Sequence, residues 1–339
     1  MRNIVSIVIP IYNMSASIER TVQSLLVQDY REIEILLVDD GSVDDSYAIC
    51  KKIATQDERI KVYHIENSGS GPARNVGIER ANGAWIYFPD ADDYIYPNAI
   101  STMVKGTENG TYDLVVFGFE WIKKNHVILT HSYKEDRISA AELRKDYSQC
   151  VMMTCPRGIQ GAPWNKLFKL ETIKKHHIEY PPLRRHQDEA FIADYMCHAQ
   201  QVHFIPDVLY SYYLNDLQKE WEKYPVDYYK AVIGLYKTRK ETILSWCKED
   251  HLAHEYIDSE YICKAIKSIE LLYSPKARMT PAERKTEIKH IISCTRLKHF
   301  DAPPMLGIYQ RTILSLIKKD AINSLYFIFS LKVSLERFK

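Results

Sequence analysis

Apolar positions in the first hundred residues fall into short continuous runs, separated by segments in which apolar residues recur every three or four positions. The runs at 4–10 (IVSIVIP) and 33–42 (IEILLVDDGS) predict buried strands, and 61–65 (KVYHI) and 84–88 (AWIYF) predict two further strands. The segments between them predict helices. Strands that alternate with helices favour an α/β fold with a doubly wound, mostly parallel sheet.

Small polar residues mark the predicted helix starts. Ser15 or Ser17 can cap a first helix that has one apolar face. Ser42, with Asp45 three residues later, resembles a capping box that opens a second helix toward position 56. A glycine-bearing loop precedes a third predicted helix around 76–81.

The pattern changes after a fifth predicted strand at 112–121. Between 150 and 215 it is less regular, and from about 225 it is helical to the end, with breaks near 274–275, 280–281 and 303–304. We therefore expect an α/β domain at 1–215 and a helical region at 216–339.

Polar residues follow the predicted strands where each strand ends. They are Tyr12 and Asn13, Asp39 and Asp40, the segment 67–75, and the acidic segment 90–93. The carboxyl ends of parallel strands meet at one edge of a sheet, which is where such folds bind ligands. Ordinary turn and capping chemistry is the alternative reading of each loop.

Composition and charge narrow the class of protein. The 339 residues are 46% hydrophobic and 26% charged, as in globular proteins with a large core. Lys and Arg number 45 and Asp and Glu 44, so the net charge of +1 gives no overall field that attracts nucleic acid.

Seven scattered cysteines form no CxxC pair, and we expect reduced core residues in a cytoplasmic protein. They are Cys50, Cys150, Cys155, Cys197, Cys247, Cys263 and Cys294. The N-terminal apolar run is too short for a signal peptide, and no run is long enough to span a membrane.

Several motifs, taken together, resemble the family 2 glycosyltransferases, inverting enzymes of the GT-A fold that use nucleotide-sugar donors. The matching pieces occur in the family's order: VSIVIPIYN, VDDGSVDDS, NSGSGPARNVGIERANGAWIYFPDADD, APWNKLF and QDEAF. They cover roughly the first 215 residues. The joint match is far more specific than any one piece.

The resemblance gives the acidic segment FPDADD a role. It implies that Asp92 binds Mn²⁺ or Mg²⁺ and that Asp90 reaches the ribose or a metal-bound water. Such hard cations take oxygen ligands and neutralise the charge that grows on a leaving diphosphate. Asp93 either supports the metal site or caps the helix that Pro97 begins.

The resemblance also places the nucleotide. Pro10 and Tyr12 match positions that shape the slot for the base, and Asp40 matches the acceptor for the N–H group of the base. A carboxylate acceptor suits uracil, so UDP is the expected nucleotide. Core packing is the alternative for Tyr12.

Arg74 begins a helix at a point from which its guanidinium can reach phosphate or sugar, and Gly69 and Gly71 allow a close approach. Many relatives carry a further arginine after the tyrosine-rich element, where this chain has Tyr213 and Leu214. Arg184 or Arg185 can replace it, or the metal alone holds the phosphates.

Inversion needs a base that takes the proton of the acceptor hydroxyl. The resemblance implies Asp188 in HQDEAF, with Glu189 as the second choice, and Gln187 stands where relatives often have an acid. Trp164 and Lys166 match a segment beside the acceptor. For Trp164, packing in the core is an equal alternative.

The tail at 321–339 is apolar with interspersed basic residues. That composition is typical of helices that lie on anionic membranes, which would make the protein peripheral to the inner face of the cell membrane. A terminal helix packed on the catalytic domain, or on a second subunit of a homo-oligomer, is the alternative.

The leading hypothesis is an enzyme that moves a hexose or N-acetylhexosamine from a UDP-sugar to a glycan or lipid-linked glycan. The alternative is a catalytically silent subunit of a polysaccharide synthase, although a silent copy has no reason to retain Asp90, Asp92 and Asp188. A Rossmann oxidoreductase is excluded, because Pro10 to Asn13 stand where its glycines belong.

Overall fold

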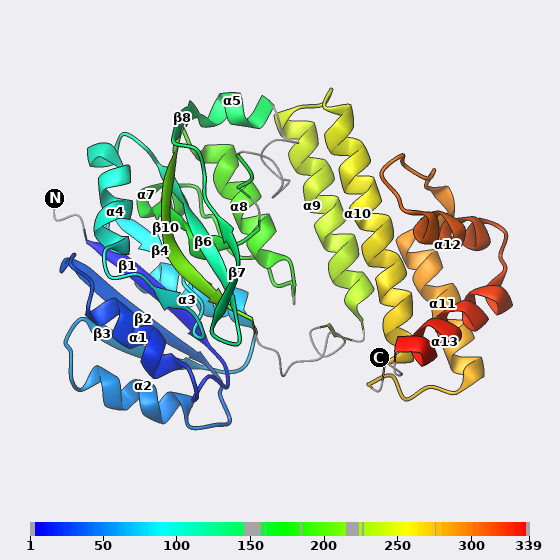
Figure 1. Cartoon of the computed structure of the whole chain (residues 1–339), viewed down its shortest axis with the longest axis horizontal. Coiled ribbons are helices and arrows are strands. Elements are labelled where there is room, and N and C mark those ends of the chain that lie inside the picture. The colour runs from blue at the N-terminus through cyan, green and yellow to red at the C-terminus, as the bar shows by residue number, and fades with distance from the viewer. Residues whose placement is uncertain are drawn as a thin grey trace. The chain divides into compact units, whose positions relative to one another are not determined.

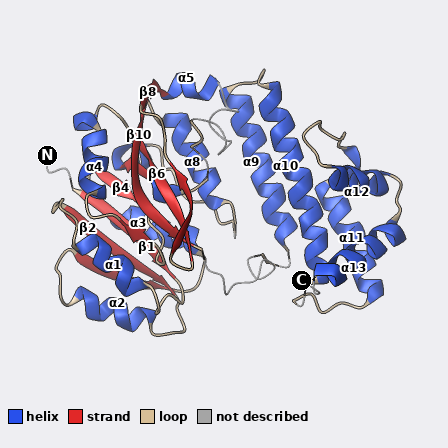
Figure 2. Cartoon of the chain, in the orientation of Figure 1, coloured by secondary structure: helices blue, strands red, loops and turns tan. Residues whose placement is uncertain are grey.

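The computed structural model describes residues 4–145, 157–159, 161–183, 185–214, 224–225, 227–274 and 276–336. The chain divides into two compact units, Met1–Asp216 and Leu217–Lys339. The first unit contains helices and strands, whereas the described part of the second is helical (Figure 1, Figure 2).

A ten-stranded sheet forms the centre of the first unit (Figure 1). The main strand order is β3-β2-β1-β4-β9-β6-β10-β5, with β7 beside β6 and β8 beside β10. Six strands (β1 to β4, β6 and β10) run in one direction and four run against them. The described strands are β1 Val5–Ile11, β2 Ile33–Asp40, β3 Ile60–Ile65, β4 Trp85–Tyr87, β5 Tyr94–Ile95, β6 Leu114–Lys123, β7 His126–His131, β8 Asp136–Ser139, β9 Lys166–Lys169 and β10 Gln201–Tyr213.

Helices cover both faces of this sheet. Alternate residues of β1, such as Ile7 and Ile9, share a core cluster with residues of α1, α2 and α4. On the other face, α3 lies against β1 so closely that a Cβ on Gly77 would be 2.1 Å from Cγ1 of Val8. The described helices of this unit are α1 Ile18–Leu26, α2 Ser46–Ala54, α3 Ser70–Arg80, α4 Ala99–Gly106, α5 Ala140–Lys145, α7 Leu170–Lys175 and α8 Gln187–His198, with single 3₁₀ turns η1 Glu108–Gly110 and η2 Pro163–Asn165.

A mostly parallel sheet with helices on both faces confirms the predicted fold class. The first four predicted strands are all present as β1 to β4. Their apolar, β-branched runs are buried along nearly their whole length in β1 and β2, because helices cover both sides.

The predicted capping box at Ser42 is wrong. Helix α2 begins at Ser46, and its N-cap residue, Asp45, makes no side-chain cap hydrogen bond. Instead, Asp44 accepts the Ser46 N–H at 3.0 Å, and the Ser42 hydroxyl accepts the N–H of Asn13. Helix α3 also begins six residues earlier than the predicted position 76.

The stretch between 150 and 215 is more regular than its sequence pattern indicates. It contains β9, α7, α8 and the 13-residue strand β10. Pro206 interrupts the apolar pattern of β10, and the pairing of β10 with β6 shifts register between Phe204 and Val208. That irregularity conceals one long strand from a search for uniform alternation.

The described helices of the second unit enclose their own apolar core. They are α9 Tyr228–Trp246, α10 His251–Glu270, α11 Pro281–Thr295, α12 Ile308–Lys318 and α13 Ile322–Glu336, with 3₁₀ turns η4 Leu271–Tyr273 and η5 Leu297–His299. Thr280 and Glu283 form a capping box at the start of α11. Helix α11 begins at Pro281, at one predicted break, and 303–304 lie between η5 and α12, at another. The break predicted at 274–275 includes Pro275, which lies outside the described residues.

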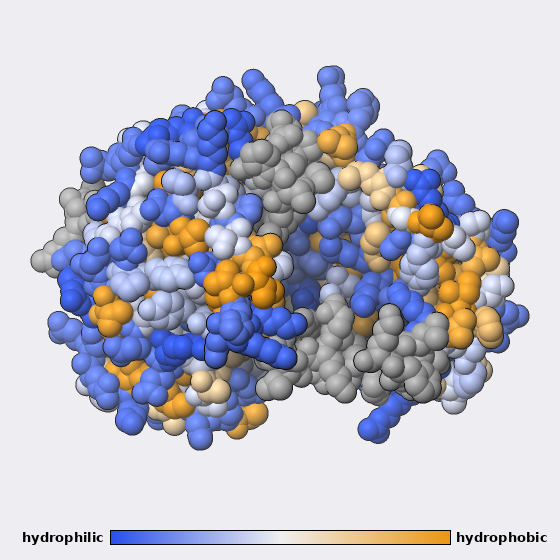
Figure 3. Space-filling view, viewed as in Figure 1, coloured by the Kyte–Doolittle hydropathy of each residue, from blue (hydrophilic) through white to orange (hydrophobic). Residues whose placement is uncertain are grey.

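The tail helix α13 packs on the other helices of its own unit. Leu325 and Phe329 are fully buried in the core cluster, and the Tyr273 hydroxyl donates to the Tyr326 carbonyl at 3.0 Å. Phe327 and Leu331 on the same helix are 65% and 50% exposed. In Figure 3 hydrophobic surface gathers over α12 and α13.

In the part of the chain that the structure describes, no helix is long and apolar enough to cross a bilayer.

The cysteines are only partly core residues. Cys50 is buried, whereas Cys197 and Cys294 are exposed, so the prediction that all lie in the core is wrong for these two. Cys150 and Cys155 lie outside the described residues.

The packing of α13 predicts unequal effects for two neighbouring phenylalanines. Phe329→Ala should lower the free energy of unfolding by about 3–5 kcal/mol, because it leaves a cavity in the core of the helical unit. Phe327→Ala, on the exposed face, should change it by less than about 0.5 kcal/mol. Urea unfolding followed by circular dichroism measures both. Equal effects would contradict this packing.

Candidate active site

A cavity of about 310 Å³ opens at the carboxyl ends of β1, β2 and β4. It brings together seven of the nine predicted site residues from five separate stretches of the chain. Its lining consists of Pro10, Ile11, Tyr12, Met14, Asp40, Ser70, Arg74, Asp90, Ala91, Asp92, Asp188 and Tyr212. Trp164 and Lys166 are not part of this lining.

One end of the cavity is formed by the ends of β1 and β2. Pro10 is buried, and Tyr12, just beyond the strand, is 44% exposed. The Asp40 carboxylate accepts the N–H groups of Ser68 at 2.7 Å and Gly69 at 2.8 Å. Asp40 therefore also holds the loop that precedes α3.

That loop needs a glycine. Gly69 has φ +102°, a conformation that side-chain-bearing residues rarely adopt. The turn lets Ser70 begin α3 beside the cavity, and the Ser70 hydroxyl accepts a hydrogen bond from Gln187 at 2.8 Å.

The acidic segment after β4 sends its side chains in different directions. Asp90 and Asp92 line the cavity, and burial followed by the charge of Asp90 raises the pKa of Asp92 to about 6. Asp93 is fully buried outside the cavity lining. Its burial, with the charges of Asp90 and Asp92, raises its pKa well above the ordinary value.

Asp93 anchors the segment to β10. Its carboxylate accepts the Tyr210 hydroxyl and, at 2.7 Å, the N–H of Tyr213. The predicted alternative, a helix cap, is wrong, because α4 begins at Ala99 with Asn98 at the N-cap. The hydroxyl of Tyr210 also accepts the N–H of Asp90 at 3.1 Å.

Arg74 lies between two of the cavity's carboxylates. Its Nη2 donates to Asp90 at 2.7 Å and its Nη1 to Asp188 at 3.0 Å, while only 3% of the side chain is exposed. These charges outweigh the cost of burial and raise the pKa of the guanidinium. The predicted phosphate or sugar ligand is thus, in this structure, the link between the acidic segment and α8.

The first turn of α8 distinguishes the two candidate bases. Asp188 faces Arg74 and the cavity, and burial raises its pKa to about 6 against the opposing effect of Arg74. Glu189 does not line the cavity and lies 3.0 Å from Nδ1 of His186. Gln187 is buried against Ser70.

Trp164 and Lys166 lie in the interior. Trp164 is 9% exposed and stacks on Tyr210 at 4.8 Å, so the core-packing alternative describes its position. Lys166 Nζ donates to the Ala162 carbonyl at 2.7 Å, and burial lowers its pKa to about 7. A role on the acceptor side stays a prediction for both residues.

Two further arginines, Arg184 and Arg185, are the predicted substitutes for the arginine that many relatives carry. Arg184 lies outside the described residues. Arg185 acts electrostatically on the hydroxyl of Tyr212, which lines the cavity. A third guanidinium, which the sequence patterns did not single out, is that of Arg20, whose carbon lies 4.2 Å from the centre of the Tyr213 ring.

The carboxylates fit a hard divalent cation shared with a diphosphate. Among the described residues, no group of three His, Cys, Asp or Glu side chains is placed to hold a metal by itself. Asp90 and Asp92 both line the cavity, and the charge of Asp90 contributes to the raised pKa of Asp92. Their carboxylates offer oxygen ligands, and a bound cation would relieve the repulsion between them. Mg²⁺ and Mn²⁺ take such incomplete protein sites and complete them with phosphate oxygens.

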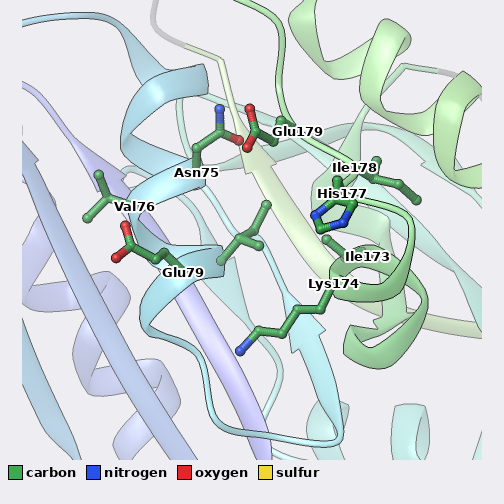
Figure 4. Close-up of a pocket in the computed structure, with 9 residues that line it drawn as sticks. Asn75, Val76, Glu79, Ile173, Lys174, His177, Ile178 and Glu179 are labelled. Carbon is green, nitrogen blue, oxygen red and sulfur yellow. The ribbon is translucent and has the colours of Figure 1, made fainter.

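A larger cavity, of about 610 Å³, lies between α3 and α7 and contains none of the predicted residues (Figure 4). Asn75 borders it and joins the two segments: it donates to the Tyr180 carbonyl at 2.9 Å and accepts the Tyr180 N–H at 2.8 Å. It thereby fixes α3 to the segment that leads into Asp188.

Sequence patterns missed the cavity residues Met14, Ser70 and Tyr212. Ser70 lies in the polar segment 67–75, immediately before the GPARN motif, and this position is the signal that could have singled it out. Tyr212 is two residues after Tyr210 in a strand, so the two side chains share one face. Met14 carried no chemical signal.

Comparisons with known proteins identify the family of this chain. The family model "Glycosyl transferase family 2" matches residues 6–169. Glycosyltransferase GlyG of Streptococcus pneumoniae is 31% identical over 218 residues, which cover 62% of this chain and 71% of GlyG. The chain belongs to glycosyltransferase family 2.

Other relatives and solved structures extend the comparison. Uncharacterized glycosyltransferase YibD of Escherichia coli is 28% identical over 214 residues, 63% of this chain and 62% of YibD. Residues 1–349 of S. aureus TarS in complex with UDP-GlcNAc share the fold, with a TM-score of 0.65 at 18% identity over 97% of this chain and 91% of that one. A complex of the same TarS segment with UDP has a TM-score of 0.64.

The position of Arg74 predicts a pKa change that needs no substrate. Arg74→Met removes the positive charge that opposes the effect of burial, so the pKa of Asp188 should rise above about 6. Carboxyl ¹³C NMR titration of the variant measures it. Arg59→Met, which breaks the pair of Arg59 with Asp57, is the matched control and should leave Asp188 unchanged. A lower pKa of Asp188 in Arg74→Met would refute the geometry.

Proposed function

We propose that this glycosyltransferase moves a hexose or N-acetylhexosamine from a UDP-sugar to a glycan or lipid-linked glycan, with inversion at the anomeric carbon. The observation that carries the proposal is the single cavity in which Tyr12 and Asp40, Asp90 and Asp92, and Asp188 meet. The proposal assigns Tyr12 and Asp40 to the nucleoside, Asp90 and Asp92 to the diphosphate and its cation, and Asp188 to the acceptor hydroxyl.

The nucleoside end favours uracil. In the proposed complex Pro10 and Tyr12 form the slot, and Asp40 accepts the uracil N–H while its carboxylate still holds the loop at Ser68. The TarS complexes with UDP and UDP-GlcNAc support the same nucleotide within this fold.

Asp92 holds the divalent cation in this proposal, and Asp90 supports it from the Arg74 side of the cavity. The bound cation supplies positive charge to the diphosphate that leaves. Asp188 accepts the proton of the acceptor hydroxyl while the hydroxyl oxygen bonds to the anomeric carbon and the bond to the UDP oxygen breaks. At neutral pH a carboxyl with a pKa of about 6 is mostly ionised and ready to accept that proton.

The retained geometry also argues against a catalytically silent subunit. A protein that only binds nucleotide or glycan needs no second carboxylate in the cavity besides those of the acidic segment. Asp188 nevertheless lines the cavity, where it accepts a hydrogen bond from Arg74. Membrane contact through 321–339 is a separate proposal. Because α13 buries Leu325 and Phe329 in its own unit, the exposed Phe327 and Leu331 are the residues that would make this contact.

Metal and nucleotide dependence form one prediction. UDP with Mn²⁺ should bind more tightly than GDP or CDP with Mn²⁺, and EDTA should abolish transfer, because oxygen ligands from Asp92 and the diphosphate share the cation. Asp92→Ala should behave as the wild type does in EDTA. Isothermal titration with each nucleotide, with and without Mn²⁺, measures the affinities, and a transfer assay with and without EDTA measures the metal dependence of activity. Full transfer in EDTA would eliminate the metal, and equal affinity for all nucleotides would eliminate the uracil slot.

The base assignment yields the test that separates an enzyme from a binding module. Asp188→Asn should lower kcat by about 10²-fold or more and leave UDP binding intact, because a base acts on the acceptor proton. Glu189→Gln is the matched control with a small effect. In the wild type kcat should fall as pH drops below about 6, where Asp188 becomes protonated. Unchanged transfer by Asp188→Asn would rule out this mechanism.

A further inference from the structure

Helix α1 carries a second buried face that is polar. Its apolar residues Ile18, Val22 and Leu25 enter the core of the sheet, as expected for a helix of this fold. Thr21 and Ser24, however, are also buried, at 0% and 2% exposure, and so is Gln28 just beyond the helix. Their spacing of three and four residues puts them on one side. Buried polar groups need partners, so this side must serve something.

All three side chains bond to the backbone of one segment, the one that carries the acidic residues. Thr21 Oγ1 lies 3.0 Å from the Ala91 carbonyl and 2.8 Å from the Asp93 carbonyl, between which it shares its proton. Ser24 accepts the Ile95 N–H at 3.3 Å. Between the end of β4 at Tyr87 and the start of β5 at Tyr94 the segment is not part of a strand, and these bonds to α1 satisfy part of its backbone.

Gln28 continues the series with both ends of its amide. It donates to the Tyr96 carbonyl at 2.7 Å and accepts the N–H of Ile100, in the first turn of α4, at 3.0 Å. The exposed Arg20, at the other end of the face, donates to the carbonyl of Asp92 itself and lies over the Tyr213 ring.

The same helix also borders the nucleoside end. The N–H groups of Ser17 and Ile18 both donate to the Met14 carbonyl at 3.0 Å, and Met14 lines the cavity with Tyr12. One rigid helix therefore connects the base slot with the backbone on either side of Asp92. The pairing of β1 with β4 fixes their separation within the sheet, and α1 bonds to the segment that continues beyond β4.

We propose that the polar face of α1, formed by Arg20, Thr21, Ser24 and Gln28, is a positioning device that sets Asp92 at the distance from the base slot that a cation bound to the UDP diphosphate requires. The inference rests on the proposed function, because it takes Asp92 as the metal ligand. It assigns these four residues no contact with the donor. They act through the backbone of 91–96.

The test compares isosteric variants of the full chain. Thr21→Val keeps the shape of the side chain and removes its hydrogen bond, whereas Thr21→Ser keeps the hydroxyl. We expect Thr21→Val to weaken Mn²⁺ binding in the presence of UDP by about tenfold or more, as loss of groups that orient metal ligands usually does. Thr21→Ser should stay within about twofold of the wild type. Electron paramagnetic resonance of free Mn²⁺ measures both.

A second readout uses protein without metal or nucleotide. Hydrogen exchange of the amides at 91–100 should accelerate in Thr21→Val and not in Thr21→Ser, because the segment loses its anchor to α1. UDP binding in EDTA should change little, since the base slot itself is intact. A purely stabilising role would instead lower the melting temperature and leave the Mn²⁺ affinity of the folded protein unchanged.

Two further variants keep the outcome decisive. Arg20→Gln alters an exposed residue and should fold even if Thr21→Val does not, and it should weaken Mn²⁺ binding severalfold. Thr55→Val, at the end of α2, removes a comparable bond to the Lys52 carbonyl and should have no effect on Mn²⁺.

The outcomes separate the two proposals. Mn²⁺ affinity within twofold of the wild type in folded Thr21→Val and in Arg20→Gln overturns the positioning role alone. Failure of the wild type to bind Mn²⁺ in the presence of UDP overturns the metal role in the proposed function, and this inference falls with it.

Discussion

The site depends on one buried cation, the guanidinium of Arg74. It joins Asp90, at the end of β4, to Asp188, at the start of α8, which are separated by 98 positions in the sequence. Without it, carboxylates from two segments would share a cavity with no positive side chain bonded to them, and their mutual repulsion in a partly dry environment would push them apart. The two ion pairs of Arg74 therefore hold the first turn of α8 beside the acidic segment.

Acidic charge is concentrated in this fold because other groups are arranged to tolerate it. Burial and the charges of Asp90 and Asp92 raise the pKa of Asp93, and the hydrogen bonds from Tyr210 and from the N–H of Tyr213 oppose that rise. Asp40 is satisfied by two backbone N–H groups of the loop before α3. Asp92 differs from both, because its backbone carbonyl accepts a hydrogen bond from Arg20 while its carboxylate lines the cavity and has no ion-pair partner among the described residues. That difference is what makes Asp92 suited to an added cation.

The sequence predicts the strands that appear as short apolar runs, and it misses features that depend on distant partners. Strands β1 to β4 are predicted by their apolar runs. The site residues are predicted either by their positions at the ends of those runs or by the family motifs. The start of α2 was misplaced because Asp44 and Ser46 compete locally with the capping box at Ser42. Strand β10 was obscured by Pro206, and the polar face of α1 is invisible without the segment some 70 residues later that it binds. The tail composition suits a membrane as well as a core, and the structure shows that Leu325 and Phe329 of α13 pack in the core while Phe327 and Leu331 are exposed.

The choice of base also depends on structure at the scale of single side chains. Gln187, Asp188 and Glu189 are consecutive in one helical turn, and successive residues on a helix point about 100° apart. The first therefore reaches Ser70, the second Arg74, and the third turns back to His186. Glu189 packs so closely on Gly161 that a Cβ at position 161 would lie 2.8 Å from the Cγ of Glu189. Three similar polar side chains thus have three different environments, and only the middle one combines an opening to the cavity with a pKa near neutrality.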